Sequence, residues 1–271
     1  PGVHGRWFHL YINGLYWGMY HLHERPDANY MATYFGGAKD DYDAVNSGEA
    51  TDGNLTSWNR MWALARKAED PDMFAELETQ LNVDALIDYI LLNFYVGNWD
   101  WDGHNWRAAG AAEVTGARWH FFPWDSEFAI SPNGAGVINS PAPIENALTI
   151  DRTGSGGGAN RPTGLHAALL KSSIYKQRFA DRVQKHMFNG GPLSPEGATA
   201  IWRKRSDLMD IAIVAESARW GDYKRDLVPG RWAKDDFDLY TKKDHYLPNQ
   251  KFILETYLPQ RTDVVLGQLR K

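Results

Sequence analysis

Residues 83–96, VDALIDYILLNFYV, constrain the fold more than any other part of the sequence. Asn82 and Asp84 are both residue types that cap helix starts, and Gly97 is typical of the position after a helix end. Apolar side chains occur nearly all the way round the predicted helix, so the helix should be buried on most of its sides. We therefore expect the rest of the chain to pack around it.

The other predicted elements make this an α+β protein. Strands are predicted over residues 7–12, 15–22, 106–110 and 117–122. Helices are predicted over residues 28–37, 56–68, 83–96, 164–188, 195–220 and 249–270. The pair Asn13-Gly14 between the first two strands is the strongest short-range signal for a type I′ hairpin. Pro259 is expected to kink the last helix.

The remaining segments are expected to be loops. Residues 38–54 are acidic and rich in turn residues, and a turn near Gly116 should join the last two strands. Residues 131–164 are rich in Pro, Gly, Ser and Asn, which predicts a long loop. No linker or internal repeat is apparent, so residues 1–271 are expected to form one domain. Three basic residues share one face of a predicted helix and are expected to be solvated: Arg178, Arg182 and Lys185.

Composition excludes several kinds of site. The chain has no cysteine, which excludes disulfides, thiolate catalysis and Cys-ligated zinc. Its net charge of −5 gives no general attraction to nucleic acid or to an anionic membrane surface. No apolar run approaches the roughly 18–20 residues of a membrane-spanning helix. An anionic substrate would therefore need local Lys or Arg side chains, or a bound cation.

Residues 97–106, GNWDWDGHNW, place several polar side chains directly after the predicted buried helix. Four residues separate Asp100 from Asn105, and Asp125 follows at the end of a predicted strand. In phosphoryl transfer from a nucleotide, one Asp accepts the proton of the attacking hydroxyl, while an Asn and a second Asp hold Mg²⁺. The charge of the metal offsets that of the phosphates, which carboxylates alone would repel. This order of residues therefore predicts a magnesium–nucleotide site.

Other interpretations of these residues remain open. Asp and Asn are common in turns, and Asp102 and His104 are expected to support the loop. Four tryptophans in or near these segments are expected to be packing anchors: Trp99, Trp101, Trp106 and Trp124. Paired carboxylates among many aromatic residues also describe a glycosidase cleft, although the Asn of the D-x4-N pattern favours metal and phosphate.

Three stretches of the chain resemble the signature blocks of the CotH (spore-coat protein H) kinase family. They are YINGLYWGMYHLHERPD, NWDWDGHNW and FFPWDSE, at residues 11–27, 98–106 and 121–127. The resemblance covers most of residues 7–190 and includes FADRVQKHMFNGG at residues 179–191. It implies an atypical kinase with a protein-kinase-like fold.

The resemblance also implies roles for individual residues. Asp100 matches the catalytic aspartate, while Asn105 and Asp125 match metal-binding residues that also hold the nucleotide. Glu127 fills the second acidic position of the third block and, by the same resemblance, would be an auxiliary metal ligand. Glu24 would anchor the hinge between the lobes or bind the ribose. The implied reaction is Mg²⁺-dependent transfer of the ATP γ-phosphate to a Ser or Thr hydroxyl of a protein.

The same resemblance divides the chain into lobes. Residues 1–26 would be the end of the N-lobe and the hinge, and residues 27–271 the C-lobe. Arg6 is the one basic residue ahead of the hinge segment and Lys39 is the first lysine, so the phosphate-binding lysine of a kinase has no counterpart here. We therefore expect an N-terminally truncated kinase. The alternative is a non-catalytic protein that uses a kinase fold for interactions at a surface or coat.

The family resemblance also suggests where the protein acts. It favours an extracellular location or a spore or cell surface. The expected acceptor is then a coat protein, another secreted protein or the enzyme itself. Neither a nucleic-acid partner nor a membrane span is expected.

Overall fold

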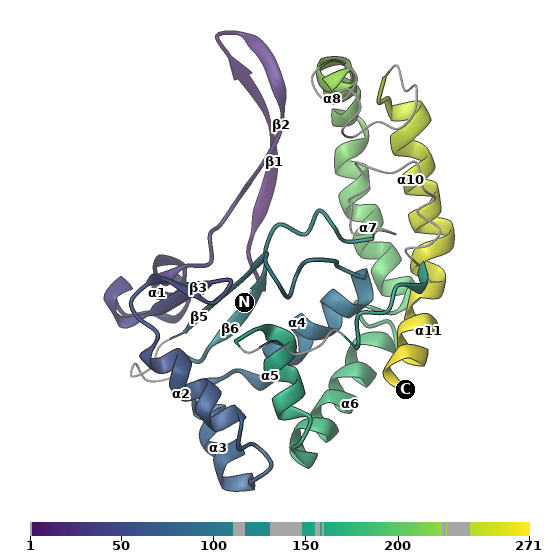
Figure 1. The fold of residues 1–271 in the computed structure, drawn as a ribbon. Helices are drawn as coiled ribbons and strands as arrows, with labels where there is room; N and C mark the ends of the chain where they lie inside the picture. Colours follow the sequence, from purple (N-terminus) through teal and green to yellow (C-terminus); the bar gives the residue numbers. More distant parts are fainter. Residues whose placement is uncertain are drawn as a thin grey trace. The chain divides into compact units, whose positions relative to one another are not determined.

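The computed structural model describes residues 2–110, 117–130, 148–154, 158, 160–223, 226 and 239–271. Contacts divide the chain into two compact units. The first consists of residues 1–3, 24–126 and 152–185, and the second of residues 4–23, 127–151 and 186–271. Each unit is described by itself (Figure 1). The predicted turn near Gly116 and most of the predicted loop over residues 131–164 lie outside the described residues.

The first unit combines a four-stranded antiparallel sheet with helices. In the strand order β4-β3-β5-β6, the strands are β3 (Asp43–Asn46), β4 (Glu49–Asp52), β5 (Trp106–Gly110) and β6 (His120–Pro123). The helices are α1 (Ala28–Phe35), the short 3₁₀ turn η1 (Lys39–Asp41), α2 (Thr56–Ala65), α3 (Pro71–Gln80), α4 (Val83–Val96), α5 (Pro162–Leu169) and α6 (Ser173–Met187). Helix α1 contacts β5, and α4 contacts β6 and α5 (Figure 1).

Helix α4 is the buried helix that the sequence predicts. The Asn82 side chain accepts a hydrogen bond from the Ala85 amide at 3.0 Å and so caps its first turn. Gly97 ends it in the left-handed conformation, with φ of 61°. Leu86, Ile87 and further residues of α4 are fully buried, so the helix lies in the core of the first unit.

The described residues of the second unit form a hairpin and two helical segments. The hairpin strands are β1 (Gly5–Ile12) and β2 (Leu15–His23), and the helical elements are α7 (Pro195–Asp210), α8 (Ala212–Trp220), η3 (Lys242–Tyr246), α10 (Leu247–Phe252), η4 (Ile253–Tyr257) and α11 (Leu258–Leu269). Asn13 and Gly14 both have positive φ, at 52° and 81°, which confirms the predicted hairpin turn. Helix α7 packs against α11, so the two helical segments lie side by side (Figure 1).

Side chains of α8 cover backbone groups of the hairpin strand β2. The Met19 amide donates to the Glu216 carboxylate at 2.7 Å, and the Trp220 indole donates to the Trp17 carbonyl at 2.6 Å. The rings of Trp17 and Trp220 also meet edge to face. Backbone groups of β2 that could otherwise form hydrogen bonds with a further strand are thus bonded to a helix.

Several predicted boundaries are wrong. The acidic segment 38–54 contains the β3–β4 hairpin, and the predicted helix over residues 164–188 is two helices, α5 and α6. The Ser172 hydroxyl accepts from the Tyr175 amide at 3.4 Å, so this serine begins a new helix instead of continuing the old one. The predicted helix over residues 195–220 is interrupted at Ile211. Helix α3 was not predicted, although Asp70 caps it and Pro71 occupies its first position.

The last helical segment begins at Lys242, earlier than predicted, and contains two π-helical turns. Each π turn, η3 and η4, is followed directly by a Leu-Pro pair. The Leu258 amide donates to the Ile253 carbonyl five residues earlier, just ahead of Pro259. Because proline has no amide hydrogen and crowds the preceding turn, a widened turn accommodates Pro259 without ending the helix. None of the described helices is both long enough and apolar enough to cross a membrane.

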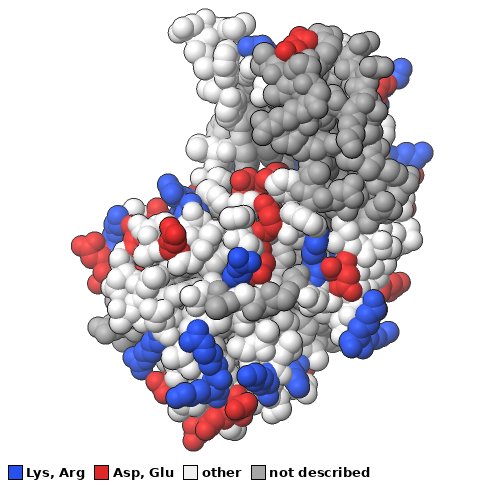
Figure 2. All heavy atoms as spheres, in the orientation of Figure 1, with Lys and Arg blue, Asp and Glu red and all other residues white. Residues whose placement is uncertain are grey.

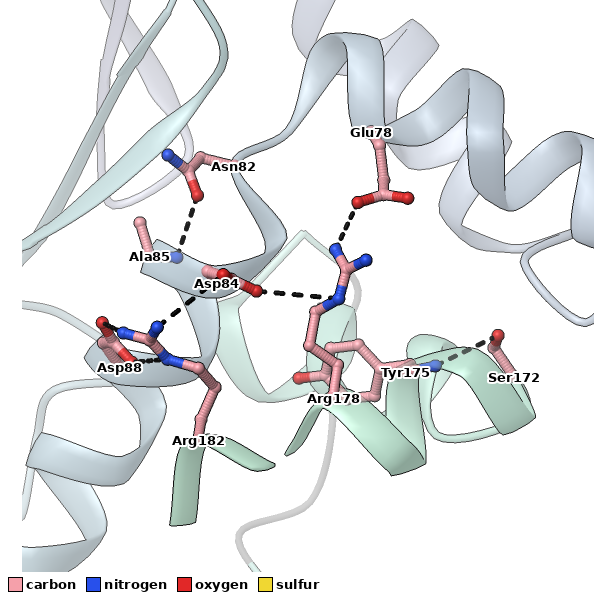
Figure 3. A network of polar contacts seen from close by, with 9 residues as sticks. All are labelled: Glu78, Asn82, Asp84, Ala85, Asp88, Ser172, Tyr175, Arg178 and Arg182. Atoms are coloured by element: carbon pink, nitrogen blue, oxygen red, sulfur yellow. Dashed lines mark hydrogen bonds and ion pairs between the residues drawn. The ribbon is translucent and has the colours of Figure 1, made fainter. Parts of the chain in front are cut away.

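Basic residues of α6 face acidic residues of α3 and α4 (Figure 3). Arg178 pairs with Glu78 and lies 3.7 Å from Asp84. Arg182 binds both carboxylate oxygens of Asp88, one of them from Nε at 2.7 Å. The prediction that Arg178 and Arg182 lie on a solvated face is therefore wrong, because their partners come from helices about a hundred residues earlier in the chain. The network ties α6 to the buried helix α4.

Replacing Arg182 with Met should lower the free energy of unfolding by about 1–3 kcal/mol, because the Asp88 carboxylate loses a two-point, charge-assisted partner. Lys176→Met on the exposed side of α6 is the matched control and should change stability by less than about 0.5 kcal/mol. Urea unfolding followed by circular dichroism measures both. Equal stabilities for the two variants would show that the pair contributes nothing.

His166 is buried between α4, α5 and α6 and is 8% exposed. Its ring packs against Phe94 and Phe179, and its Nδ1 lies 2.8 Å from the Tyr175 hydroxyl. Burial lowers the pKa of His166 to about 4. The folded protein therefore holds this histidine neutral, whereas the unfolded chain protonates it near pH 6.5.

Stability should consequently fall as the pH drops from about 6.5 to about 4, since the unfolded state binds the proton first. The contribution of His166 is on the order of 3 kcal/mol, present in full above pH 6.5. His166→Gln should reduce the difference in urea unfolding free energy between pH 7.5 and pH 4.5. The exposed His9→Gln variant should keep the full difference. An unchanged pH dependence in His166→Gln would contradict the assignment.

Candidate functional site

The loop that carries the D-x4-N pattern begins where α4 ends. The Asn98 side chain donates to the Asn93 side chain at 3.1 Å, and the His104 amide donates to the Asp100 carbonyl at 2.9 Å. Trp101 and Trp106 are each 1% exposed, and the Trp101 ring meets the rings of Tyr89 and Phe94 edge to face. These two tryptophans are packing anchors, as predicted, and they hold the middle and the end of the loop in the core.

Asp100 and Asn105 are bonded directly to each other. The Asn105 amide nitrogen donates to Oδ2 of Asp100 at 2.7 Å. The other oxygen of Asp100, Oδ1, is buried and has no hydrogen-bond partner among the described residues. Asn105 has φ of 58°, a left-handed conformation that Asn tolerates better than most residues. The loop thus brings the two predicted residues together at some conformational cost.

Asp125 lies close enough to affect Asp100. Burial raises the pKa of Asp100, and the negative charge of Asp125 raises it further, while hydrogen bonds from its own amide and from Asn105, together with His104, act against this. Asp125 follows β6, is exposed and also has positive φ, at 49°. The structure therefore gathers Asp100, Asn105 and Asp125 in one neighbourhood.

The other two predicted site residues are Glu24 and Glu127. The Tyr34 hydroxyl donates to Glu24 at 2.5 Å, so α1 holds this carboxylate just after β2. Glu127 is exposed and belongs to the second unit.

Of the predictions for two further residues of the loop, Asp102 and Trp99, one is confirmed and one is wrong. Asp102 accepts from the amide and the hydroxyl of Thr163, at 2.8 and 2.7 Å, and so caps α5. Its predicted supporting role is confirmed. Trp99 is 52% exposed with the Arg152 guanidinium 4.6 Å from its ring centre, so its prediction as a packing anchor is wrong.

Sequence reasoning missed Arg107, which lies on β5 two positions after Asn105. It is 4% exposed, and its guanidinium lies 4.3 Å from the centre of the Trp124 ring. Burial lowers the pKa of Arg107, the nearby Arg25 lowers it further, and Asp27 acts in the opposite direction. Its Nε and Nη1 atoms are buried without a hydrogen-bond partner in the described part of the chain. The signal in the sequence is one charged residue in the otherwise apolar strand WRAAG.

These side chains suit a hard cation. A carboxylate only accepts hydrogen bonds, so the Asn105 nitrogen must face Asp100, and the Asn105 oxygen is left for another partner. Asp125 adds an exposed carboxylate. The described residues contain no cluster of three His, Asp or Glu side chains suited to a metal. An amide and a carboxylate oxygen nevertheless match Mg²⁺, which usually completes its shell with water and phosphate oxygens.

Comparison with known proteins gives one result. The sequence model of a family described as CotH kinase protein matches residues 1–241 of the 271-residue chain. The matched range contains the hairpin, the D-x4-N loop and Asp125. A search of curated proteins returned no match.

Proposed function

The chain belongs to the CotH kinase protein family, and from this premise we propose that it transfers the γ-phosphate of ATP to a Ser or Thr hydroxyl of a protein. Membership suggests a kinase-like function. The observation that carries the finer proposal is the Asp100–Asn105 hydrogen bond in the neighbourhood of Asp125. Three groups that phosphoryl transfer uses for different tasks lie together.

Each of these residues has a distinct task in the proposal. Asp100 accepts the proton of the attacking hydroxyl through its carboxylate. Asn105 holds Oδ2 of Asp100 and so orients the carboxylate. Asn105 and Asp125 offer oxygen ligands, with Glu127 as an auxiliary ligand. Bound Mg²⁺ would offset the negative charge of the phosphates next to these carboxylates.

We also propose a kinase-like organisation for the chain. Residues 1–271 would form one domain, in which residues 1–26 are the end of the N-lobe and the hinge and residues 27–271 the C-lobe. The β1–β2 hairpin followed by a segment held through Glu24 supports this order of elements. Glu24 would then anchor the hinge or contact the ribose.

Labelled ATP tests the proposal. The protein is incubated with Mg²⁺ and either γ- or α-³²P-ATP, with EDTA as the control, and label in protein is counted, including label in the enzyme itself. We expect incorporation from γ-labelled ATP only, and only with Mg²⁺. Incorporation from α-labelled ATP would mean that another part of the nucleotide is transferred. No incorporation and no nucleotide binding would instead favour a non-catalytic interaction protein.

The surface charge fits a protein acceptor better than a polyanion. Figure 2 shows basic and acidic side chains interspersed over the residues drawn in colour, in keeping with the net charge of −5. That net charge gives no general attraction to nucleic acid. The proposed acceptor is a coat protein, another secreted protein or the enzyme itself.

A further inference from the structure

Arg107 is a buried cation without a hydrogen-bonding partner in the described part of the chain. It is 4% exposed, and its Nε and Nη1 atoms are buried without hydrogen bonds. Removing a charge from water without supplying a partner is costly, so buried arginines are normally paired. The other arginine pairs of this unit follow that rule, as Arg182 with Asp88 shows. Arg107 is therefore a candidate for a ligand that carries negative charge.

The position of Arg107 is set by the sheet. Its strand partner in β6 is Phe122, and Trp124 follows two residues later, which puts the arginine and Trp124 on the same face. The guanidinium lies 4.3 Å from the Trp124 ring centre, so one of its faces is occupied by the indole. Nη2 is not among the buried unpaired atoms and is the accessible end of the group.

Arg107 and Trp124 are each close in sequence to a proposed metal ligand. Arg107 lies two residues after Asn105, and Trp124 immediately precedes Asp125. A nucleotide held at Asn105 and Asp125 would bring several anionic oxygens to this part of the first unit, where Asp100 and Asp125 are themselves acidic. The nearby Arg25 adds positive charge, which Asp27 partly offsets. A phosphate would add counter-charge to what Asp27 supplies.

We propose that the Arg107 guanidinium binds a phosphate oxygen of the nucleotide, an inference that rests on the proposed function. Arg107 would then supply positive charge close in sequence to the acidic and amide groups of the proposed site. Guanidinium groups are well suited to this task, because they keep their charge when buried and match phosphate geometry.

Two substitutions separate binding from folding. Arg107→Met removes the charge but keeps much of the volume, so it should raise the midpoint of thermal unfolding of the free protein. It should also weaken Mg-ATP binding by at least about tenfold, as measured by calorimetry. Arg107→Lys should recover part of the affinity. The matched control is Arg66→Gln, an exposed arginine whose guanidinium also lies by a tryptophan ring, and it should bind like the parent protein.

Comparing ligands that contain different parts of the nucleotide shows which part Arg107 contacts. The Arg107→Met substitution should weaken the binding of Mg²⁺-tripolyphosphate as much as it weakens the binding of Mg-ATP. It should leave any binding of adenosine unchanged. Loss of adenosine affinity to the same degree would overturn the phosphate contact. A destabilised Arg107→Met with unchanged affinity for Mg-ATP and tripolyphosphate would show a purely structural role. Arg107-dependent tripolyphosphate binding without label transfer from ATP would support this inference and contradict the proposed function.

Discussion

Asp100→Asn should lower phosphoryl transfer by about 10²–10⁴-fold, the usual contribution of a general base. The asparagine keeps the size of the side chain and can still bond to Asn105, but it cannot accept the proton of the attacking hydroxyl. Mg-ATP binding should stay within about threefold of the parent protein, because Asp100 is not a proposed metal ligand. The measurements are the rate of γ-³²P transfer and calorimetric binding of Mg-ATP.

Asp102→Asn is the matched control, since it makes the same change two residues away in the same loop. Asp102 caps α5 through Thr163, so this variant should lose about 1 kcal/mol of stability and keep its transfer rate within a few fold. Full transfer activity in Asp100→Asn would remove Asp100 from the mechanism. Equal loss of transfer in both variants would indicate that the loop, and not the carboxylate, is what matters.

Asp125→Ala should abolish measurable Mg-ATP binding, and transfer with it. This exposed carboxylate follows β6 and is the strongest proposed oxygen ligand, so its loss leaves Asn105 with one neutral oxygen for the cation. Binding should be measured at several Mg²⁺ concentrations, because excess metal partly compensates for a lost ligand. Glu127→Ala should give a smaller loss, as expected of an auxiliary ligand.

The control for Asp125→Ala is Asp40→Ala, which removes an exposed acidic residue of η1 outside the proposed site. It should bind Mg-ATP like the parent protein. If Asp125→Ala also retains parental binding at every Mg²⁺ concentration, Asp125 is not a ligand. If Asp125→Ala loses binding while its thermal unfolding is unchanged, the effect is local to the site.

The parts of the fold that local chemistry specifies were predictable. Asn82, Gly97 and Asn13-Gly14 act within a few residues of their own position, and they mark the ends of α4 and the hairpin turn as expected. The break between α5 and α6 was less visible, because Ser172 is one of many serines that could continue or cap a helix. The partners of Arg178 and Arg182 lie on α3 and α4, which a helical pattern alone does not reveal.

The candidate site was likewise predictable only in part. The spacing of Asp100 and Asn105, followed by Asp125, predicted their proximity because a helix end, a loop and a strand pair must return the chain to one place. Arg107 was missed because sequence alone cannot distinguish an arginine buried against Trp124 from one at the sheet surface. Trp99 was misjudged for the opposite reason, since tryptophan in a loop does not have to be buried.

The bonds between β2 and α8 imply an order of events during synthesis. The hairpin can form as soon as residues 5–23 are available, because its contacts are local. The helix that bonds to Met19 lies 197 residues further along the chain, which corresponds to about 10–40 s of translation. During that interval the strand lacks its Glu216 and Trp220 partners and can pair with a strand from another nascent chain. Polysomes that synthesise several copies at once would bring such strands together, so folding yield should depend on spacing between ribosomes.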